Sequence, residues 1–225
     1  IKLLNSFGFD SIEADLSTRP EKSIGNSDDW EKATNSLKSA LENQNISYVT
    51  AHGEGAFYGP KIDLHVKDAI GRRWQLSTIQ VDFAQPDNFD LQFVDSNNKR
   101  VKPVMIHRAL LGSIERFTGI LIENYAGEFP GWLSPVQVKV LTIGDVSNYV
   151  NKITKSIKGF RYEVDDRNLR LGEKLHDATK DKVPITLIVG EKDELSNTLA
   201  INIRSQDNQQ NVKYEDAIKQ IKANL

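Results

Sequence analysis

The spacing of hydrophobic residues predicts a helix and then a sheet in the first half of the chain. Apolar residues recur at helical intervals over residues 28–44, and Ser27 or Asp28 can cap the first turn. From residue 61 onward, apolar and polar positions mostly alternate, as they do in strands with one buried face. We therefore expect an antiparallel sheet from three segments, 61–66, 72–83 and 101–111, the last interrupted by Pro103.

A helix and a proline-containing segment follow the predicted sheet. Gly112 and Ser113 open the helix, apolar residues recur over 114–125, and Gly127 ends it. Two prolines and a glycine then lie among large apolar residues in 129–135, a composition typical of a boundary between domains. We therefore expect one domain over residues 1–131 and a second over residues 132–225.

Strands and helices alternate in the second predicted domain. Continuous apolar runs predict buried strands, and amphipathic segments between them predict helices. This alternation indicates an α/β layer domain, whereas the first domain is of the α+β class with an antiparallel sheet. The expected strands are 136–143, 160–164, 185–189 and 199–203, and the expected helices are 146–157, 171–180 and 214–225.

Composition and charge limit the kinds of binding site and partner that the chain can have. The chain contains no cysteine, so neither a disulfide nor a thiolate metal ligand is possible. The apolar runs are shorter than a membrane span, and Ile1–Leu4 has neither the basic leader nor the cleavage site of a signal peptide. We therefore expect a cytoplasmic protein with no membrane partner. Residues 134–225 carry 15 Lys and Arg against 13 Asp and Glu, a slight basic excess that favours nucleic-acid binding only weakly.

Two groups of residues that could bind a ligand lie in or next to the predicted sheet. A glycine-rich turn over 54–61 ends in Lys61 and suits an anionic ligand, although most such turns only join two strands. In strand 74–82, Gln75 and Gln80 could bind a hydroxyl, an amino group or a ribose, or could simply face solvent. Because the two amides are five positions apart, a regular strand places them on opposite faces. They can share one ligand only if the strand contains a bulge.

The third cluster runs from a strand into a helix. Arg116 lies in the first turns of the helix, where its guanidinium can bind a phosphate through two N–H groups. Alternatively, Arg116 pairs with Glu115 or Asp82 on the surface. His107 lies in the apolar strand, where a lone histidine is more often a hydrogen-bonded core residue than a metal ligand.

The order and spacing of these clusters resemble those of bacterial-type threonyl-tRNA synthetases, a family of class II aminoacyl-tRNA synthetases. The resemblance extends over essentially the whole chain, and residues 107–117 resemble the family's form of class II motif 3. It implies part of an antiparallel-sheet class II catalytic core, followed by a small α/β mixed-sheet anticodon-binding domain. The matching segments are 16–22 with Gly25, 53–61, 74–75, 80–83 and 103–117.

The resemblance implies a threonine–tRNA ligase that activates L-threonine with ATP and Mg²⁺ and transfers it to threonine tRNA. Arg116 matches the motif 3 arginine that binds the γ-phosphate of ATP, and Lys61 and Gln75 are the other expected catalytic residues. Placement and charge neutralisation carry most of such phosphate chemistry. The residues expected to line the threonine and adenylate pocket are Tyr58, Lys61, Gln75, Thr78, Gln80, Ser113 and Arg116.

The resemblance also implies a zinc ion, for which His107 matches one of three ligands. In the family this zinc binds the amino group and hydroxyl of threonine and so rejects valine, which lacks the hydroxyl. The other two ligands, a cysteine and a histidine, precede Ile1 in the family's order, as do motifs 1 and 2. We therefore expect this chain to be part of a longer, homodimeric enzyme and to be inactive alone.

In the second domain, the resemblance implies a set of anticodon-binding residues. Asn168 matches a position that contacts the anticodon in the family. Lys182, Asp193 and Asn202 stand where the family has Arg, Glu and Arg, and Arg204 lies near the last of them. Lysine keeps the charge of arginine but loses its paired hydrogen bonds.

Two other functions remain as alternatives. The chain could be a stand-alone tRNA-binding or regulatory module, or part of a prolyl, glycyl or histidyl enzyme with the same kind of anticodon domain. The turn Tyr58–Lys61 together with His107–Leu110 favours the threonyl enzyme over the other synthetases.

Overall fold

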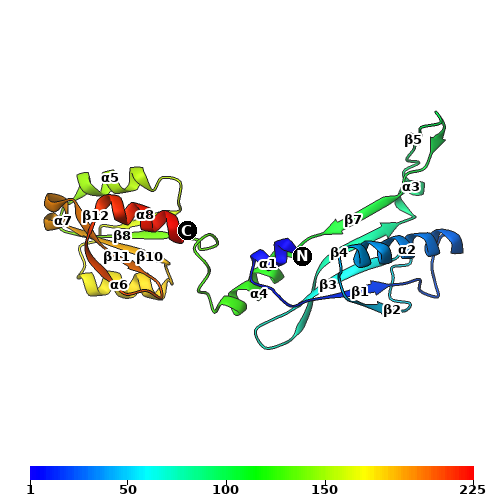
Figure 1. The fold of residues 1–225 in the computed structure, drawn as a ribbon, viewed down its shortest axis with the longest axis horizontal. Coiled ribbons are helices and arrows are strands. Elements are labelled where there is room, and N and C mark those ends of the chain that lie inside the picture. Colours follow the sequence, from blue (N-terminus) through cyan, green and yellow to red (C-terminus); the bar gives the residue numbers. More distant parts are fainter. The chain divides into compact units, whose positions relative to one another are not determined.

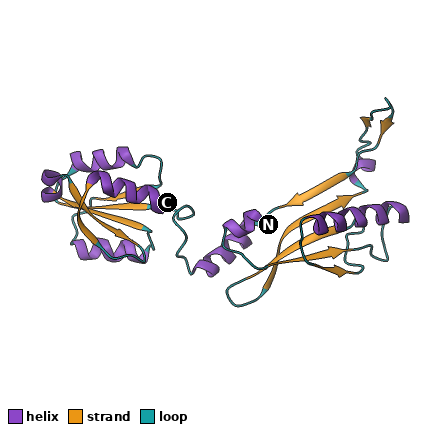
Figure 2. Cartoon of the chain, viewed as in Figure 1, coloured by secondary structure: helices purple, strands orange, loops and turns teal.

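The computed structural model describes residues 1–225 and divides into two compact units, Ile1–Asn124 and Tyr125–Leu225. Each unit is a sheet with helices packed on it (Figures 1 and 2). The prediction of an antiparallel-sheet unit followed by an α/β unit is therefore confirmed. The placement of the domain boundary at residue 131 stays a prediction. No helix in the chain is both long enough and apolar enough to cross a bilayer.

The first unit is built on a five-stranded sheet with strand order β2-β1-β3-β4-β7. Neighbouring strands are antiparallel except β1 and β2, which are parallel. A separate two-stranded hairpin is formed by β5 and β6. The strands are β1 Ile12–Ser17, β2 Tyr48–Ala51, β3 Lys61–Lys67, β4 Arg73–Asp82, β5 Phe93–Val94, β6 Arg100–Val101 and β7 Met105–Ala109.

One face of this sheet is covered by α2 (Figure 1). Leu37 and Leu41 of α2 pack with Leu16, Ile62 and Val81 in a buried apolar cluster. The cap of α2 differs from the prediction, because the side chain of Asn26, not Ser27 or Asp28, accepts from the Asp29 N–H at 2.8 Å. The helices of this unit are α1 Lys2–Ser6, α2 Ser27–Asn43, α3 Gln85–Asn88 and α4 Ile114–Tyr125.

The second unit has a sheet with order β12-β11-β10-β8-β9. The pairs β8–β9 and β8–β10 are parallel, whereas β11 is antiparallel to both of its neighbours. Helices α5 and α8 cover one face and α6 covers the other (Figure 1). The elements are β8 Val138–Ile143, α5 Ser147–Ser156, β9 Tyr162–Asp165, α6 Leu171–Lys180, β10 Ile185–Gly190, α7 Glu191–Ser196, β11 Thr198–Ile203, β12 Gln209–Lys213 and α8 Tyr214–Asn224.

Strand topology sets where polar residues of this unit gather. Because β8, β9 and β10 run parallel, their carboxyl ends meet at one edge of the sheet. The loops that follow them lead into the starts of α5, α6 and α7 at that same edge. Strands β8 and β10 are almost fully buried and mainly apolar, as expected for the interior of a sheet covered on both faces, whereas the edge strand β9 is mostly exposed.

Candidate functional site

A bulge in β4 brings Gln75 to the same face of the first sheet as Thr78 and Gln80. Thr78 pairs with Asp63 and Gln80 pairs with Lys61, but Gln75 pairs with His65 across a shift in register. The shift adds one residue to β4 and so reverses the alternation of side chains before it. Gln75 and Gln80 therefore lie on the same face of the sheet, as they must if both bind one ligand.

Asp63 gathers three of the predicted site residues on this face. Its carboxylate accepts from Lys61 Nζ at 2.6 Å, from Gln75 Nε2 at 2.5 Å and from Thr78 Oγ1 at 2.6 Å. Asp63 itself is buried, with 4% of its surface exposed. The sequence analysis did not include Asp63, although the alternation of Lys61, Asp63 and His65 along one strand placed it on the polar face.

Tyr58 and Gln80 form a second contact at the edge of this cluster. The Tyr58 hydroxyl donates to Gln80 Oε1 at 3.1 Å, which leaves the Gln80 amide group as a donor. The turn that carries Tyr58 packs tightly on β4, because a Cβ at Gly59 would lie 1.9 Å from the Val81 carbonyl oxygen. Only glycine fits there, so the turn fixes Tyr58 and Lys61 relative to the strand.

Arg116 reaches the same sheet from α4. Its Nη2 donates to the backbone carbonyl of Gln75 at 2.6 Å, and its guanidinium lies 5.9 Å from the centre of the Trp74 ring. The alternative of a surface pair with Glu115 or Asp82 is wrong. Glu115 instead accepts from the Ser113 hydroxyl at 2.7 Å, and that hydroxyl lies at the start of α4.

His107 lies opposite Gln80 on the edge strand β7. Its Nε2 is 2.6 Å from Asp82 Oδ2, while the other oxygen of Asp82 accepts from the Ala84 and Gln85 N–H groups. Burial raises the pKa of Asp82, but hydrogen bonds from Gln85, His107 and Ala84 hold it below its ordinary value. The side chain of His107 is 47% exposed. It is therefore not a buried core histidine, which is the more common role of a lone histidine in an apolar strand.

These residues do not by themselves form a zinc site. Asp82 occupies one imidazole nitrogen of His107, and nowhere in the structure do three or more His, Cys, Asp or Glu residues converge on one point. Structural zinc sites in proteins use four ligands and catalytic sites three. His107 can supply one nitrogen, Nδ1, to a metal whose remaining ligands lie elsewhere.

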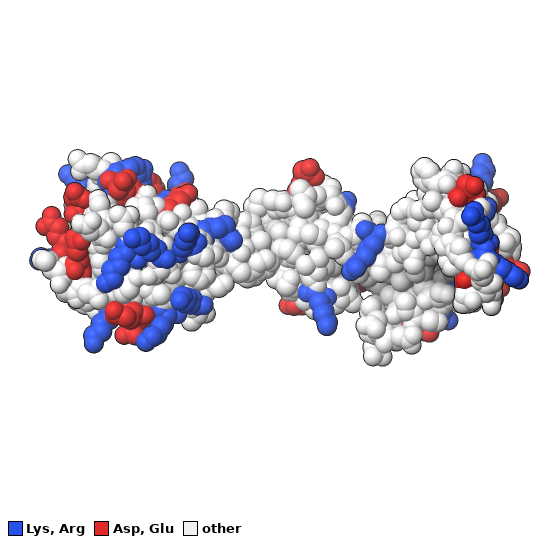
Figure 3. Space-filling view, turned by 90° about the horizontal axis from the view of Figure 1, so that it is seen from above, with Lys and Arg blue, Asp and Glu red and all other residues white.

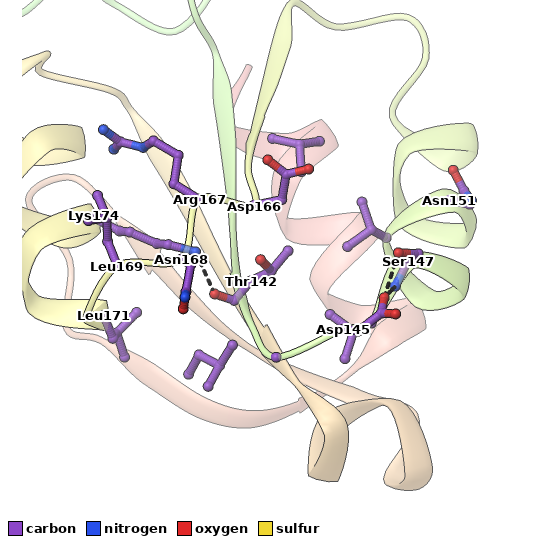
Figure 4. Close-up of a pocket in the computed structure, with 15 residues that line it drawn as sticks. Thr142, Asp145, Ser147, Asn151, Asp166, Arg167, Asn168, Leu169, Leu171 and Lys174 are labelled. Atoms are coloured by element: carbon purple, nitrogen blue, oxygen red, sulfur yellow. Dashed lines mark hydrogen bonds between the residues drawn. The ribbon is translucent and has the colours of Figure 1, made fainter.

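The C-terminal unit has a pocket of about 680 Å³ where the carboxyl ends of β8 and β9 meet. Figure 4 shows Asp145 and Ser147 at the entry to α5 on one side, and Asn168 and Leu169 from the loop before α6 with Leu171 at the start of α6 on the other. The lining therefore contains both polar and apolar side chains, with polar ones in the majority, and can offer a ligand hydrogen bonds as well as an apolar contact.

Lys174 holds the strand ends together beneath this pocket. It is 2% exposed, and its Nζ donates to the carbonyl oxygen of Thr142 at 2.9 Å (Figure 4) and to that of Asp165 at 3.0 Å. A buried ammonium is tolerated only when its hydrogens are bonded. The lysine thus joins α6 to the carboxyl ends of β8 and β9, next to the loop that carries Asn168.

The five predicted anticodon-binding residues lie at two opposite ends of the sheet. Asn168 and Asp193 follow the carboxyl ends of β9 and β10, and Asp193 caps α7 by accepting from the Gly190 N–H at 2.9 Å. Lys182 precedes β10, and Asn202 pairs with Thr186 at the start of that strand. The structure therefore brings only Asn168 into the pocket.

Lys182 and Arg204 bind the segment that begins this unit. Lys182 Nζ donates to the Ala126 carbonyl oxygen at 2.7 Å and lies 3.4 Å from Glu128. Arg204 donates to the carbonyl oxygens of Lys182, Glu128 and Phe129. Both side chains thus help to hold this segment, while Lys182 stays 38% exposed. Elsewhere on the unit, Lys and Arg side chains alternate with Asp and Glu over the face drawn in Figure 3.

Two family profiles match the chain, one over each unit. Residues 3–125 match the tRNA synthetase class II core domain (G, H, P, S and T). Residues 137–224 match the anticodon binding domain. The first match covers more than half of the chain.

Relatives of the chain in sequence and in structure are consistent with both family matches. The chain is 51% identical to the threonine–tRNA ligase of Clostridium tetani over 213 residues, which are 92% of this chain and 33% of that protein. It is 48% identical to that of Acetivibrio thermocellus over 218 residues, 96% of this chain and 34% of that protein. A crystal structure described as the RNA binding domain of the Cryptosporidium parvum threonyl-tRNA synthetase has a TM-score of 0.88 at 31% identity, over 99% of this chain and 57% of that one. The chain thus spans about a third of the length of the curated relatives.

Proposed function

Since the chain belongs to the family of class II tRNA synthetase core domains, joined here to an anticodon binding domain, we propose that it is part of a threonine–tRNA ligase. Its first unit contributes to the site that activates L-threonine with ATP, and its second unit binds threonine tRNA. The observation that carries the first part is the convergence of Lys61, Gln75 and Thr78 on the buried Asp63, in the same sheet that Arg116 contacts through the Gln75 carbonyl oxygen.

The proposed roles follow from the charge and hydrogen-bonding capacity of each group. Arg116 binds the γ-phosphate of Mg²⁺-bound ATP, and Lys61 offsets charge near the α-phosphate when the threonine carboxylate attacks it. Around these cations, polar side chains hold the amino acid and the adenylate. That polar set consists of Tyr58, Gln75, Thr78, Gln80 and Ser113.

His107 is proposed as one ligand of the family's zinc ion. Its exposed ring and its hydrogen bond to Asp82 support this role, since zinc-bound histidines usually bond a carboxylate through the second nitrogen. The residues of this chain do not complete a zinc site, so no step of the proposed reaction is derived from the metal. A homodimer working in the cytoplasm is proposed from family resemblance.

The second unit is proposed to bind the anticodon of threonine tRNA. The pocket beside Asn168 supports this, because an unstacked base offers free hydrogen-bonding edges and a flat apolar face. Asp193 lies beyond the same end of the sheet, whereas the other three proposed contacts lie at the opposite end. Those three, Lys182, Asn202 and Arg204, would reach a different part of the anticodon loop.

A chimera tests the catalytic proposal. The segment of the Clostridium tetani relative that matches this chain is replaced by the chain, and ATP–pyrophosphate exchange is measured with threonine, serine and valine. We expect exchange that prefers threonine, and its loss in the same chimera carrying Arg116→Ala. The chain alone serves as a further control and is expected to be inactive. A well-folded chimera without threonine-dependent exchange would contradict the proposal.

A further inference from the structure

Asp63 makes more hydrogen bonds on the candidate site than any of the predicted residues around it. Three donors from two strands meet its carboxylate at 2.5 to 2.6 Å, and two of them, Gln75 Nε2 and Thr78 Oγ1, share a single oxygen. The same Gln75 nitrogen also donates to Thr78 Oγ1 at 2.9 Å. The amide nitrogen of Gln75 is therefore fully engaged.

This arrangement fixes which end of the Gln75 amide faces outward. A carboxylate paired with an ammonium can only accept hydrogen bonds, so Gln75 must present its NH₂ group to Asp63. The Gln75 Oε1 atom is left without a partner in the chain. This arrangement offers an acceptor to a ligand, and it excludes the flipped amide that would offer a donor.

We propose that Asp63 is a positioning residue that sets the hydrogen-bonding sense of Gln75, so that Oε1 accepts from an ammonium or hydroxyl of the substrate. Asp63 need not touch the substrate, because it acts through Gln75 and through its ion pair with Lys61. The inference rests on the proposed function, since the ligand is the amino acid or its adenylate.

A neighbouring carboxylate provides a matched control. Asp15 lies directly across from Asp63 in the register of β1 and β3. It accepts from Arg73 at 2.8 Å, and no hydrogen bond joins it to Gln75. Asp15→Asn therefore removes one negative charge from the same face of the sheet without altering the Gln75 amide.

The orientation of the amide is tested by NMR on the 225-residue chain. In the unchanged chain and in Asp15→Asn, we expect the Gln75 side-chain amide protons to exchange slowly with water. In Asp63→Asn, they should exchange markedly faster while the backbone spectrum stays that of a folded protein. Equal exchange rates in all three proteins would overturn the inference, whatever the chimera does.

The functional consequence is tested by a double-mutant cycle in the chimera. Asp63→Asn should lower kcat/KM for threonine-dependent exchange by about 10- to 100-fold, the effect of losing a hydrogen bond to a charged group, and Asp63→Glu should recover part of it. Asp15→Asn should stay within about 2-fold of the parent, the range of ordinary surface changes.

The cycle separates positioning from general stability. If Asp63 acts through Gln75, Asp63→Asn should cause a much smaller loss in a Gln75→Ala background. An equal loss in both backgrounds would mean that Asp63 acts through Lys61 or through the fold and not through Gln75, and would overturn the inference. An inactive parent chimera would instead refute the proposed function and leave the NMR result to decide the role of Asp63.

Discussion

The guanidinium of Arg116 is held against the main chain of Gln75, with Nη2 2.6 Å from its carbonyl oxygen. The contact uses one nitrogen, and Nε and Nη1 have no hydrogen-bond partner in the chain. The arginine is therefore anchored to the sheet and can still donate to an anion with its remaining N–H groups. This arrangement depends on Gly112, where a Cβ would lie 2.8 Å from Nη2 and 3.2 Å from the Leu76 carbonyl oxygen.

Gly112→Ala should therefore impair the site through Arg116. The added methyl group displaces the guanidinium, and the φ of +66° at this position is also unfavourable for alanine. We expect exchange by the chimera to fall by at least about 10-fold, toward the level of Arg116→Ala. Gly119→Ala, in the helix α4 that follows Gly112, is the control, because nothing lies within 4 Å of its added methyl group. Equal activities of the two variants would contradict the anchoring role.

A second prediction concerns zinc. One imidazole and one carboxylate hold zinc poorly, so the 225-residue chain should lose zinc on dialysis, as measured by elemental analysis. In an active chimera, His107→Ala should abolish zinc retention and threonine activation together. Tight stoichiometric zinc in the chain alone would show that it holds ligands that the structure does not bring together.

Hydrophobic periodicity located the elements that have one clearly buried face. Helix α2 and strands β3 and β4 were predicted within two residues because their apolar positions pack against each other in one core. Strand β1 was not predicted, although two of its residues belong to that core, and the edge strands β2 and β12 were not predicted either. Residues 209–213 contain only one apolar residue, and an edge strand is held mainly by backbone hydrogen bonds that any sequence can make.

The geometry of the candidate site required the structure. The sequence identified Lys61, Gln75 and Gln80 but left open whether the two amides share a face, because a bulge depends on pairing between strands. It also missed Asp63, whose importance comes from three partners that lie 2, 12 and 15 positions away in the chain. Chain separation of this kind leaves no local pattern.

Acid should weaken the first unit through Asp68. Burial raises the pKa of Asp68, but hydrogen bonds from Trp74, from the Arg72 side chain and from two backbone N–H groups outweigh it and hold the pKa well below its ordinary value. A carboxyl whose folded pKa is depressed stabilises the fold above its unfolded pKa of about 4 and loses that contribution as the pH falls further.

Asp68→Asn should therefore lower the thermal midpoint at pH 7, and the difference from the unchanged chain should shrink as the pH falls below about 4. Circular dichroism melts of both proteins between pH 7 and pH 3 measure it. Asp95→Asn is a comparable control, since Asp95 also accepts backbone N–H groups in a turn but is only half-buried and has no arginine partner. A difference that stays constant with pH would show that Asp68 does not act through its charge.

The segment over 126–135 should open when its side-chain anchors are removed. Arg204 binds the carbonyl oxygens of Glu128 and Phe129, and Arg161 binds those of Trp132 and Ser134. Arg204→Ala should therefore speed chymotrypsin cleavage after Trp132 and Leu133, while circular dichroism shows the unit still folded. Arg170→Ala, an exposed arginine without a side-chain partner, should leave the rate unchanged. Equal rates in the two variants would mean that Arg204 does not restrain the segment.

The last prediction separates affinity from selectivity in tRNA binding. Asn168 lines the pocket and can pair with a base edge, whereas Lys182 is a cation at the other end of the sheet. Base-edge hydrogen bonds discriminate between sequences, but contacts from a cation to phosphates raise affinity for all of them and weaken with salt. Asn168→Ala should therefore reduce discrimination between anticodons by about 1–3 kcal/mol, the size of a paired base contact.

Lys182→Ala should instead weaken binding of every tRNA to a similar extent and reduce its dependence on salt. Filter binding of threonine tRNA and an anticodon-swapped version, at two salt concentrations, measures both effects on the 225-residue chain. Lys155→Ala serves as a control for a lysine on α5, away from both positions. If the unchanged chain binds both tRNAs equally at both salt concentrations, the pocket does not read the anticodon. The unit would then act only as an electrostatic anchor for the RNA, and Asn168 would have no role in selectivity.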